Sequence, residues 1–292
     1  MKSNTDAIIS EIPVVILAGG AGINLGSQGS IIPKAMVEIN GIPLLLYIMD
    51  HYGRAGFRKF IICGGYRLET INKFISRLPD LNNTPAMNLD KATGRVYELD
   101  DTLDRTKWEV IVLDTGIENM TGSRLAQARA KVDRGPMFCL TYGDTLSDVT
   151  LPDLLSFHIN HRKTGTLLAA HNPTRFRILG LCDDDDLIKG FSKKPVLDKD
   201  YVNGGFYFFN SSIFDLKTLS VEPTCVLETD VLEELISKRE LYTYRYDGFW
   251  QPLDNERDKQ KISQILSEPI DYKLKRGKFN EDKQLYCKLF SQ

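Results

Sequence analysis

The stretch VVILAGGAG (Val14–Gly22), which is followed by PKAM at Pro33–Met36, decides the fold class that the sequence predicts. A continuous apolar run such as Val14–Ala18 is typical of a strand that is buried on both faces of a parallel sheet. Glycines directly after such a strand let backbone N–H groups approach an anion closely. The order therefore predicts a strand, a phosphate-binding loop and a lysine, and we expect a nucleotide phosphate as the anion.

Two better-known glycine signatures do not fit this loop. A dinucleotide-binding fingerprint that begins at Gly20 requires a glycine where the chain has Leu25. A Walker loop requires Lys followed by Ser or Thr after its last glycine, whereas Gly26 is followed by Ser27 and Gln28. The glycines alone are also compatible with an ordinary connection between a strand and a helix, so the lysine and the downstream carboxylates must decide.

Composition limits the class of partner. The chain has 292 residues, of which 42% are hydrophobic and 26% charged, and this is enough for a large core. The formal net charge of -2 provides no field that would attract nucleic acid or an anionic membrane. We therefore expect no nucleic-acid partner and no membrane partner, and a small phosphorylated ligand instead.

The N-terminal residues and the cysteines indicate the compartment. Residues 1–11 have too few apolar residues for a signal peptide, and no apolar run approaches the roughly 20 residues of a membrane span. We expect a cytoplasmic protein. The cysteines are widely spaced, without a close pair of the zinc-site kind, and we expect reduced thiols that lie mostly in the core: Cys63, Cys139, Cys182, Cys225 and Cys287.

Strands and helices alternate in the first half of the chain. Further strands are predicted at 58–65, 110–114 and 137–144, and helices at 42–52, 68–78 and 123–132. This alternation predicts a doubly wound parallel sheet, in which ligands bind at the carboxyl ends of the strands.

The second half predicts smaller elements. They are a helix at 154–162, a strand at 165–170 and short strands around Leu187, Phe206 and Tyr242. Residues 79–108 are polar and without a clear period, which predicts a long excursion. The acidic run 183–186 is either a cation site or a solvated turn, and the turn is favoured; the basic stretch 273–278 either caps the domain or joins a subunit contact.

Two aspartates are candidates for a metal site. Asp144 ends a predicted strand at the edge where ligands bind, and Asp254 follows the aromatic segment 248–252. Mg²⁺ is commonly held by one or two carboxylates together with phosphate oxygens, so two distant aspartates can complete one site. Each aspartate by itself is also compatible with a cap or a turn.

Histidine gives a weaker metal candidate. His158 and His161 are three residues apart on a predicted helix and could ligate a metal ion, but without a third ligand a packing role is favoured. No local Ser-His-Asp or Cys-His signature is present in the sequence, so covalent nucleophilic catalysis is not indicated.

The motifs taken together carry a family resemblance. In order, and with similar spacing, they are residues 15–20, 33–39, 60–66, 114–125, 141–144, 203–206 and 248–254. Over roughly residues 13–262 this set resembles the sugar-phosphate nucleotidylyltransferases, and most of all their glucose-1-phosphate cytidylyltransferases. The resemblance implies an α/β fold with a Rossmann-like, doubly wound mixed sheet and a small substrate-binding β subregion, of the nucleotide-diphospho-sugar transferase type.

The resemblance also implies a reaction and a division of the chain. CMP would pass from CTP to a sugar 1-phosphate, with Mg²⁺ as cofactor, to give a CDP-sugar and pyrophosphate. An N-terminal tail (1–12) would precede the nucleotidylyltransferase domain (13–262) and a C-terminal extension (263–292) would follow it. Within the domain, about 13–150 would bind the nucleotide and about 151–262 the sugar phosphate, and we expect a homo-oligomer.

Site residues follow from the matching motif positions. The resemblance implies Lys34, Asp144 and Lys194 as catalytic residues and Asp144 and Asp254 as metal ligands. The residues implied for nucleotide binding are Leu17, Gly19, Gly20, Lys34, Thr121 and Gly143. Those implied for sugar-phosphate binding are Arg175, Lys194, Asn203, Gly204, Gly205 and Gln251, with Gln251 near the sugar or the base.

Some positions depart from the family pattern. Asn24 replaces an arginine that faces the triphosphate, Ile32 replaces a second basic residue, Lys193 replaces a glutamate and Arg177 replaces a glycine. In one hypothesis Lys193 or Arg177 supplies the lost cation, and the enzyme uses an altered phosphorylated acceptor. In the other, the chain is a catalytically impaired relative that binds a nucleotide, a sugar phosphate or a partner subunit. The retained lysines and aspartates favour the enzyme.

Overall fold

The computed structural model describes residues 4–20, 32–78, 107–132, 135–171, 178–181, 188–192 and 201–267. Its main sheet contains β1 (Pro13–Ala18), β4 (Lys59–Gly64), β5 (Glu109–Asp114), β6 (Met137–Tyr142), β8 (Gly165–His171), β9 (Ile178–Leu181), β10 (Ile188–Ser192), β11 (Tyr201–Asn210) and β12 (Leu241–Tyr246). Two small ladders pair β2 (Glu38–Ile39) with β3 (Ile42–Pro43), and β7 (Thr145–Ser147) with β13 (Trp250–Pro252).

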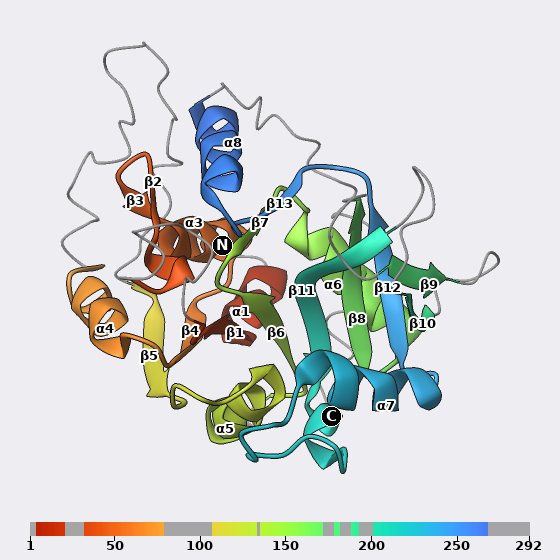
Figure 1. Ribbon diagram of the computed structural model, residues 1–292. Coiled ribbons are helices and arrows are strands. Elements are labelled where there is room, and N and C mark those ends of the chain that lie inside the picture. Colours follow the sequence, from red (N-terminus) through yellow and green to blue (C-terminus); the bar gives the residue numbers. More distant parts are fainter. Residues whose placement is uncertain are drawn as a thin grey trace.

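Helices pack around the main sheet and the small ladders, with α8 (Glu256–Ser267) beside β2 and β13 (Figure 1). They are α1 (Asn4–Glu11), α3 (Leu44–Arg54), α4 (Leu68–Ser76), α5 (Thr121–Val132), α6 (Leu151–His161), α7 (Leu232–Ser237) and α8 (Glu256–Ser267). Short helical turns lie at η1 (Lys34–Met36) and η5 (Ser211–Asp215), and η6 (Leu227–Val231) is a π-helical turn that leads into α7.

The sheet is mixed, as the fold class predicts. Its strand order is β10-β9-β11-β6-β1-β4-β5, with β8 paired to β11 and β12 paired to β8. The β1, β4, β5 and β6 strands are parallel to one another, whereas β11 runs antiparallel to both β6 and β8. The parallel half corresponds to the predicted strands, and the other half, in which β11 is antiparallel to its neighbours, corresponds to the smaller β subregion of the predicted fold class.

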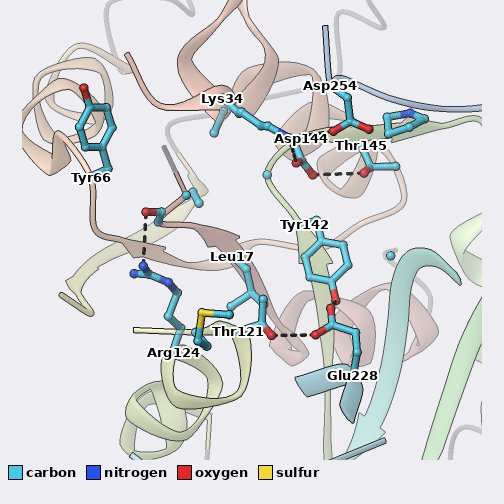
Figure 2. Close-up of a pocket in the computed structure, with 18 of the residues that line it drawn as sticks. Leu17, Lys34, Tyr66, Thr121, Arg124, Tyr142, Asp144, Thr145, Glu228 and Asp254 are labelled. Carbon is cyan, nitrogen blue, oxygen red and sulfur yellow. Dashed lines mark hydrogen bonds and ion pairs between the residues drawn. The ribbon is translucent and has the colours of Figure 1, made fainter. Parts of the chain in front are cut away.

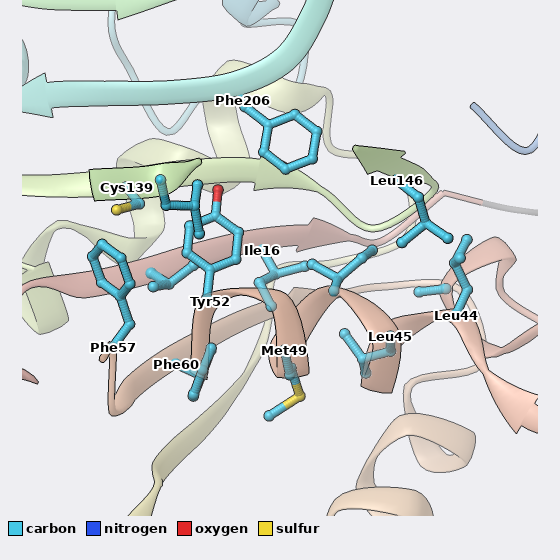
Figure 3. Close-up of a cluster of buried hydrophobic side chains, with 14 of the residues drawn as sticks. Ile16, Leu44, Leu45, Met49, Tyr52, Phe57, Phe60, Cys139, Leu146 and Phe206 are labelled. Carbon is cyan, nitrogen blue, oxygen red and sulfur yellow. The ribbon is translucent and has the colours of Figure 1, made fainter. Parts of the chain in front are cut away.

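Alternating side chains of β1 build the core on both faces of the sheet. Val14, Ile16 and Ala18 join one buried cluster with α3 and α6, and Val15 and Leu17 join a second cluster with α5 and α7. Figure 3 shows Ile16 in the first cluster, beside Met49 and Tyr52 of α3. Because both faces of β1 are covered, its sequence is continuously apolar rather than alternating.

The central strand β11 is longer than the short strand that the sequence predicts around Phe206. It spans Tyr201–Asn210 and pairs with β6, β8 and β9. The local pattern does not reveal this length, because the strand is stabilised by hydrogen bonds to segments that are far away in the chain.

Residues 1–12, predicted as an N-terminal tail, contain the helix α1. Ile9 on this helix is 2% exposed and Ile12 is 3% exposed, and both belong to the larger core cluster. A Cβ atom at Gly56 would lie 3.2 Å from Cγ2 of Ile9, so the helix packs closely against the turn after α3.

Other parts of the sequence analysis fall partly outside the described residues. Cys63, Cys139 and Cys225 are free and buried, as predicted. Residues 79–106 of the predicted excursion, Cys182, Cys287, the acidic run 183–186 and the basic stretch 273–278 lie outside the described residues. In the part of the chain that the structure describes, no helix is long and apolar enough to span a membrane.

The histidines of α6 are packing residues in this structure. Nδ1 of His158 lies 2.8 Å from Oγ1 of Thr166, its Nε2 lies 3.2 Å from Oδ1 of Asn210, and Nε2 of His161 lies 2.6 Å from the same Thr166 hydroxyl. Burial lowers the pKa of His158 to about 3 and that of His161 to about 4. These hydrogen bonds support the packing interpretation; among the described residues no group of three or more His, Cys, Asp or Glu side chains could hold a metal ion.

Replacing Ile9 by Ala should lower the free energy of unfolding by about 2–5 kcal/mol, because a buried Ile→Ala change removes packing and leaves a cavity. Val221→Ala is the matched control, since Val221 is 60% exposed and its truncation should cost less than about 0.5 kcal/mol. Denaturant unfolding measures the free energy of unfolding of both variants. Equal effects of the two variants would show that α1 does not belong to the core.

Acid should destabilise the fold through the buried histidines. The folded-state pKa of His158 is about 3, below the ordinary value of 6.5, so the unfolded chain binds more protons between these values. Stability is therefore fully present above pH 6.5 and is lost as the pH falls; this residue should contribute a loss of about 2 kcal/mol between pH 6.5 and 5. Unfolding of the wild type and of His158→Asn at pH 8 and pH 5 measures this, and an equal pH-dependent loss in both proteins would contradict it.

Candidate active site

The antiparallel pairing of β7 with β13 brings the two candidate aspartates together. Thr145 lies opposite Pro252 in this ladder, and the N–H of Leu253 donates to the carbonyl of Asp144 at 2.7 Å. Asp144 directly precedes β7, and Asp254 follows β13 by two residues. Because antiparallel strands place the start of one beside the end of the other, residues 110 positions apart in the chain share one site.

Lys34 lies between these carboxylates. Its Nζ is 3.1 Å from Oδ2 of Asp144 and 2.8 Å from Oδ1 of Asp254, and Figure 2 shows the lysine pointing toward both. Burial by itself would lower the pKa of Lys34, but the attraction of Asp144 and the hydrogen bond to Asp254 outweigh it, so the pKa is raised. The ammonium is therefore charged at neutral pH and compensates part of the negative charge of the pair.

The two carboxylates fit a divalent cation that arrives with further oxygen ligands. Carboxylate oxygens suit Mg²⁺, which keeps several waters and is usually bound through one or two carboxylates plus substrate phosphates. The side chains of Asp144 and Asp254 are 30% and 27% exposed, so their oxygens are accessible. The described residues offer no third carboxylate, histidine or thiol in the same group, so any further ligands of such an ion would have to come from water or substrate.

A cavity of about 660 Å³ opens beside this cluster. Its size is in the range of small-molecule sites. The structure brings together, in its lining, these residues of the sequence analysis: Leu17, Gly19, Gly20, Lys34, Thr121, Gly143, Asp144, Asn203, Gly204, Gly205 and Asp254. They come from the carboxyl ends of β1 and β6, from the starts of η1 and α5, from β11 and from the segment after β13. The ends of β1 and β6 form the edge of the sheet where the sequence predicts a ligand.

The glycines at the end of β1 make room for a buried arginine. A Cβ atom at Gly19 would lie 2.0 Å from Nη1 of Arg124, and one at Gly65 would lie 2.6 Å from the same atom. At Gly20 a Cβ atom would meet nothing within 4 Å, so that position faces open space. Gly19 is thus required by the packing of Arg124, in addition to any contact with a ligand.

Arg124 joins the ends of neighbouring strands. Its guanidinium donates to the carbonyls of Gly64 and Gly116 at 3.1 and 2.8 Å, and to those of Gly19 and Ile117 at 3.3 and 3.2 Å. It is 5% exposed, and burial lowers its pKa. A guanidinium stays charged in proteins, and its planar set of donors can satisfy several carbonyls at once. Arg124 therefore fixes the backbone that forms this wall of the cavity.

A second network is centred on Glu228 of the π-helical turn. Oγ1 of Thr121 donates to Oε2 of Glu228 at 2.8 Å, and the hydroxyl of Tyr142 donates to Oε1 of the same carboxylate. Figure 2 shows Thr121 and Tyr142 converging on Glu228. Burial and the neighbouring charge raise the pKa of Tyr142 well above its ordinary value, so this phenol remains a donor at neutral pH.

The network continues to the predicted sugar-binding residues. The hydroxyl of Tyr207 lies 3.2 Å from that of Tyr142 and donates to Oδ1 of Asn203 at 2.9 Å, and the same Oδ1 accepts from the N–H of Gly205 at 2.9 Å. Gly205 has a φ of 72°, and a Cβ atom there would lie 2.5 Å from the ring of Tyr142. Gly205 is thus required by backbone conformation and by packing, and Asn203 is held in one orientation.

Gln251 differs from its predicted place near the sugar or the base. It is 3% exposed and does not line the cavity, whereas its neighbours Trp250 and Pro252 do. Successive side chains of a strand point to opposite sides, so the amide of Gln251 faces α8 and donates to Asp258 at 3.4 Å. The predicted Arg175 and Lys194 lie outside the described residues, as do Asn24, Lys193 and Arg177, and Ile32 packs against the larger core cluster.

Sequence reasoning missed three side chains of the site. Arg124 belongs to a quoted motif, but nothing local shows that its guanidinium turns toward the ends of β1 and β4. Tyr142 belongs to the quoted motif 141–144, but nothing local shows that it lines the cavity and that its hydroxyl donates to Glu228. Glu228 carries no signal, because it lies in an acidic segment that looks like an ordinary helix start.

Replacing Glu228 by Gln should lower the free energy of unfolding by about 1–3 kcal/mol, because two hydroxyl donors lose a charged acceptor and one of them meets an amide donor. Glu222→Gln is the matched control, since Glu222 is an exposed surface residue on the segment before η6. Denaturant unfolding of both variants tests the network, and an unchanged Glu228→Gln protein would show that the network does not stabilise the fold.

Comparison with known proteins agrees with this geometry. Residues 13–253 match the family model described as nucleotidyl transferase. The chain is 35% identical to the glucose-1-phosphate cytidylyltransferase of Salmonella typhi over 249 residues, which cover 84% of this chain and 92% of that protein. It is 30% identical to a probable glucose-1-phosphate cytidylyltransferase of Bacillus subtilis over 254 residues, with coverages of 87% and 96%. The solved structure of HddC from Yersinia pseudotuberculosis has the same fold, with a TM-score of 0.67 at 19% identity, over 87% of this chain and 99% of HddC.

Proposed function

The chain belongs to the nucleotidyl transferase family, among the sugar-phosphate nucleotidylyltransferases, and from this premise we propose that it transfers CMP from CTP to a sugar 1-phosphate. The acceptor is glucose 1-phosphate or a related sugar phosphate, and the products are a CDP-sugar and pyrophosphate. Two relatives that match more than four fifths of the chain are named glucose-1-phosphate cytidylyltransferases, and this supports cytidine over the other bases.

The observation that carries the proposal is the position of Lys34 between Asp144 and Asp254 in the lining of the cavity. Transfer of a nucleotidyl group depends on alignment and on neutralising the charge of crowded phosphates rather than on a covalent intermediate. A lysine and two carboxylates beside a glycine-rich strand end supply the groups for this task.

Each group has a role in the proposed reaction. An oxygen of the sugar phosphate attacks the α-phosphorus of CTP, and the bond from that phosphorus to the bridging oxygen breaks to release pyrophosphate. Lys34 binds the α-phosphate and reduces its negative charge. Asp144 and Asp254 would hold Mg²⁺, which would neutralise and orient the triphosphate.

The remaining residues position the substrates. Lys194 and Arg175, which the family resemblance implies for this role, bind the phosphate of the acceptor. Asn203, whose amide is fixed by Tyr207 and Gly205, offers a donor and an acceptor to sugar hydroxyls. Thr121 and the backbone around Gly20 and Gly143 bind the nucleotide.

The impaired relative is the alternative that Asn24 leaves open. An arginine that acts on transferring phosphates can contribute about 10³ to 10⁵ in rate, so its replacement by Asn24 predicts slower turnover unless another cation compensates. The retained ion pairs of Lys34 favour activity, because a binding protein has no need for a charged lysine shared by two aspartates.

Pyrophosphate release in Mg²⁺ tests the function, with each nucleoside triphosphate against a panel of sugar 1-phosphates. We expect release with CTP and one acceptor, and a loss of at least about 100-fold in rate for Asp144→Asn, which keeps the shape but removes a charge. Asp215→Asn is the control, because Asp215 is an exposed residue that pairs with Arg129.

Two outcomes would contradict parts of this proposal. Release with another nucleotide would reject cytidine while retaining nucleotidyl transfer. Binding of CTP without release, across the panel, would favour the impaired relative.

A further inference from the structure

The two carboxylates of the candidate metal site already have a cation between them, and it is the ammonium of Lys34. Nζ lies 3.1 Å from Oδ2 of Asp144 and 2.8 Å from Oδ1 of Asp254, so one oxygen of each carboxylate is in contact with the same ammonium group. The lysine side chain is 19% exposed, and the site is thus partly shielded from water. A divalent ion that entered between these carboxylates would meet the lysine at close range, where like charges repel strongly.

We propose that Lys34 is a resident cation that occupies the carboxylate pair until a nucleoside triphosphate binds, so that metal and nucleotide bind together. This inference rests on the proposed function and concerns the regulation of the same site. In the nucleotide-free protein Lys34 balances Asp144 and Asp254. When triphosphate oxygens enter the cavity they become new acceptors for Lys34, and the carboxylates are released for the metal ion.

The contacts show which partner can move. Asp144 is fixed by the β7/β13 ladder and accepts from Oγ1 of Thr145 at 3.3 Å, and the N–H of Asp254 donates to Asp258 at 3.1 Å. Lys34, in contrast, has a flexible four-carbon stem with a charged head that contacts these two carboxylates. The aspartates are therefore held by backbone and neighbours, whereas the lysine can turn toward phosphate within the cavity that all three line.

The charges explain why the exchange requires the nucleotide. Two carboxylates and one ammonium leave a net charge of -1, which attracts a divalent ion less than two free carboxylates would. A triphosphate adds negative charge and oxygen ligands, and it withdraws the ammonium from the pair. Coupling of this kind is reciprocal, so the metal must raise the affinity for the nucleotide by the factor by which the nucleotide raises the affinity for the metal.

Binding of Mn²⁺, followed by the electron paramagnetic resonance signal of the free ion, tests the proposal. Without nucleotide, Lys34→Gln should bind Mn²⁺ at least tenfold more tightly than the wild type, since the competing cation is gone. Lys34→Arg, which retains the charge, should remain as weak as the wild type. Equal or weaker Mn²⁺ binding by Lys34→Gln would overturn the proposal.

A matched control tests whether the loss of any lysine changes Mn²⁺ binding, and a second measurement uses the wild type alone. Lys59→Gln removes a lysine that pairs with Glu11 away from the cavity, and it should bind Mn²⁺ as the wild type does. In the wild type itself, α,β-methylene-CTP, which cannot release pyrophosphate, should raise the Mn²⁺ affinity at least tenfold, and this gain should be smaller in Lys34→Gln. An unchanged Mn²⁺ affinity of the wild type with the analogue would also overturn the proposal, even if Lys34→Gln does not fold.

The test separates this inference from the proposed function. The comparison of Lys34→Gln with the wild type requires neither turnover nor an acceptor, so it can succeed when no sugar phosphate in the panel reacts. The converse result is that the wild type releases pyrophosphate with CTP while Lys34→Gln and the wild type bind Mn²⁺ equally well. This result would retain the proposed function and reject the proposal that Lys34 is a resident cation.

Discussion

The antiparallel ladder between β7 and β13 is the constraint on which the candidate active site depends. It places Asp144 and Asp254 side by side, and the hydrogen bond from Leu253 to the carbonyl of Asp144 closes the pair. Lys34 then lies between two negative charges that come from distant parts of the chain. The same ladder carries Trp250, whose indole N–H donates to the carbonyl of Gly204 at 2.7 Å, so the charged cluster and the β11 wall are joined.

The two networks around the cavity have different physical characters. Lys34 and its aspartates form a charged cluster that is partly exposed, which suits groups that exchange partners with a ligand. Arg124 and Glu228 are bound by several hydrogen bonds to backbone and hydroxyl groups, which suits a rigid wall. Pre-organised walls of this kind keep substrates aligned, and alignment is a large part of what this chemistry requires.

Much of the fold could be predicted, because its signals are local. The apolar run of β1 and the alternation of strands and helices reflect burial on both sides of a parallel sheet. The length of β11, the core position of Ile9 on α1 and the direction of Gln251, which faces α8 instead of the cavity, could not be predicted. Each depends on hydrogen bonds or packing with other segments. The role of Gly19 could not be predicted for the same reason. A Cβ atom at this position would clash with the guanidinium of Arg124, which is 105 positions away in the chain.

The sequence by itself determined the chemical inventory of this protein: a buried strand that ends in glycines, one lysine, two aspartates and the spacing of motifs that marks the family. Those features can be recognised from residue types and from short-range periodicity. The tertiary structure alone decided that Lys34 is shared by both aspartates, that Arg124 supports the strand ends, and that Glu228 links Thr121 to the β11 wall through Tyr142 and Tyr207. Such contacts depend on strand pairing and side-chain direction, and these are set only when distant segments pack together.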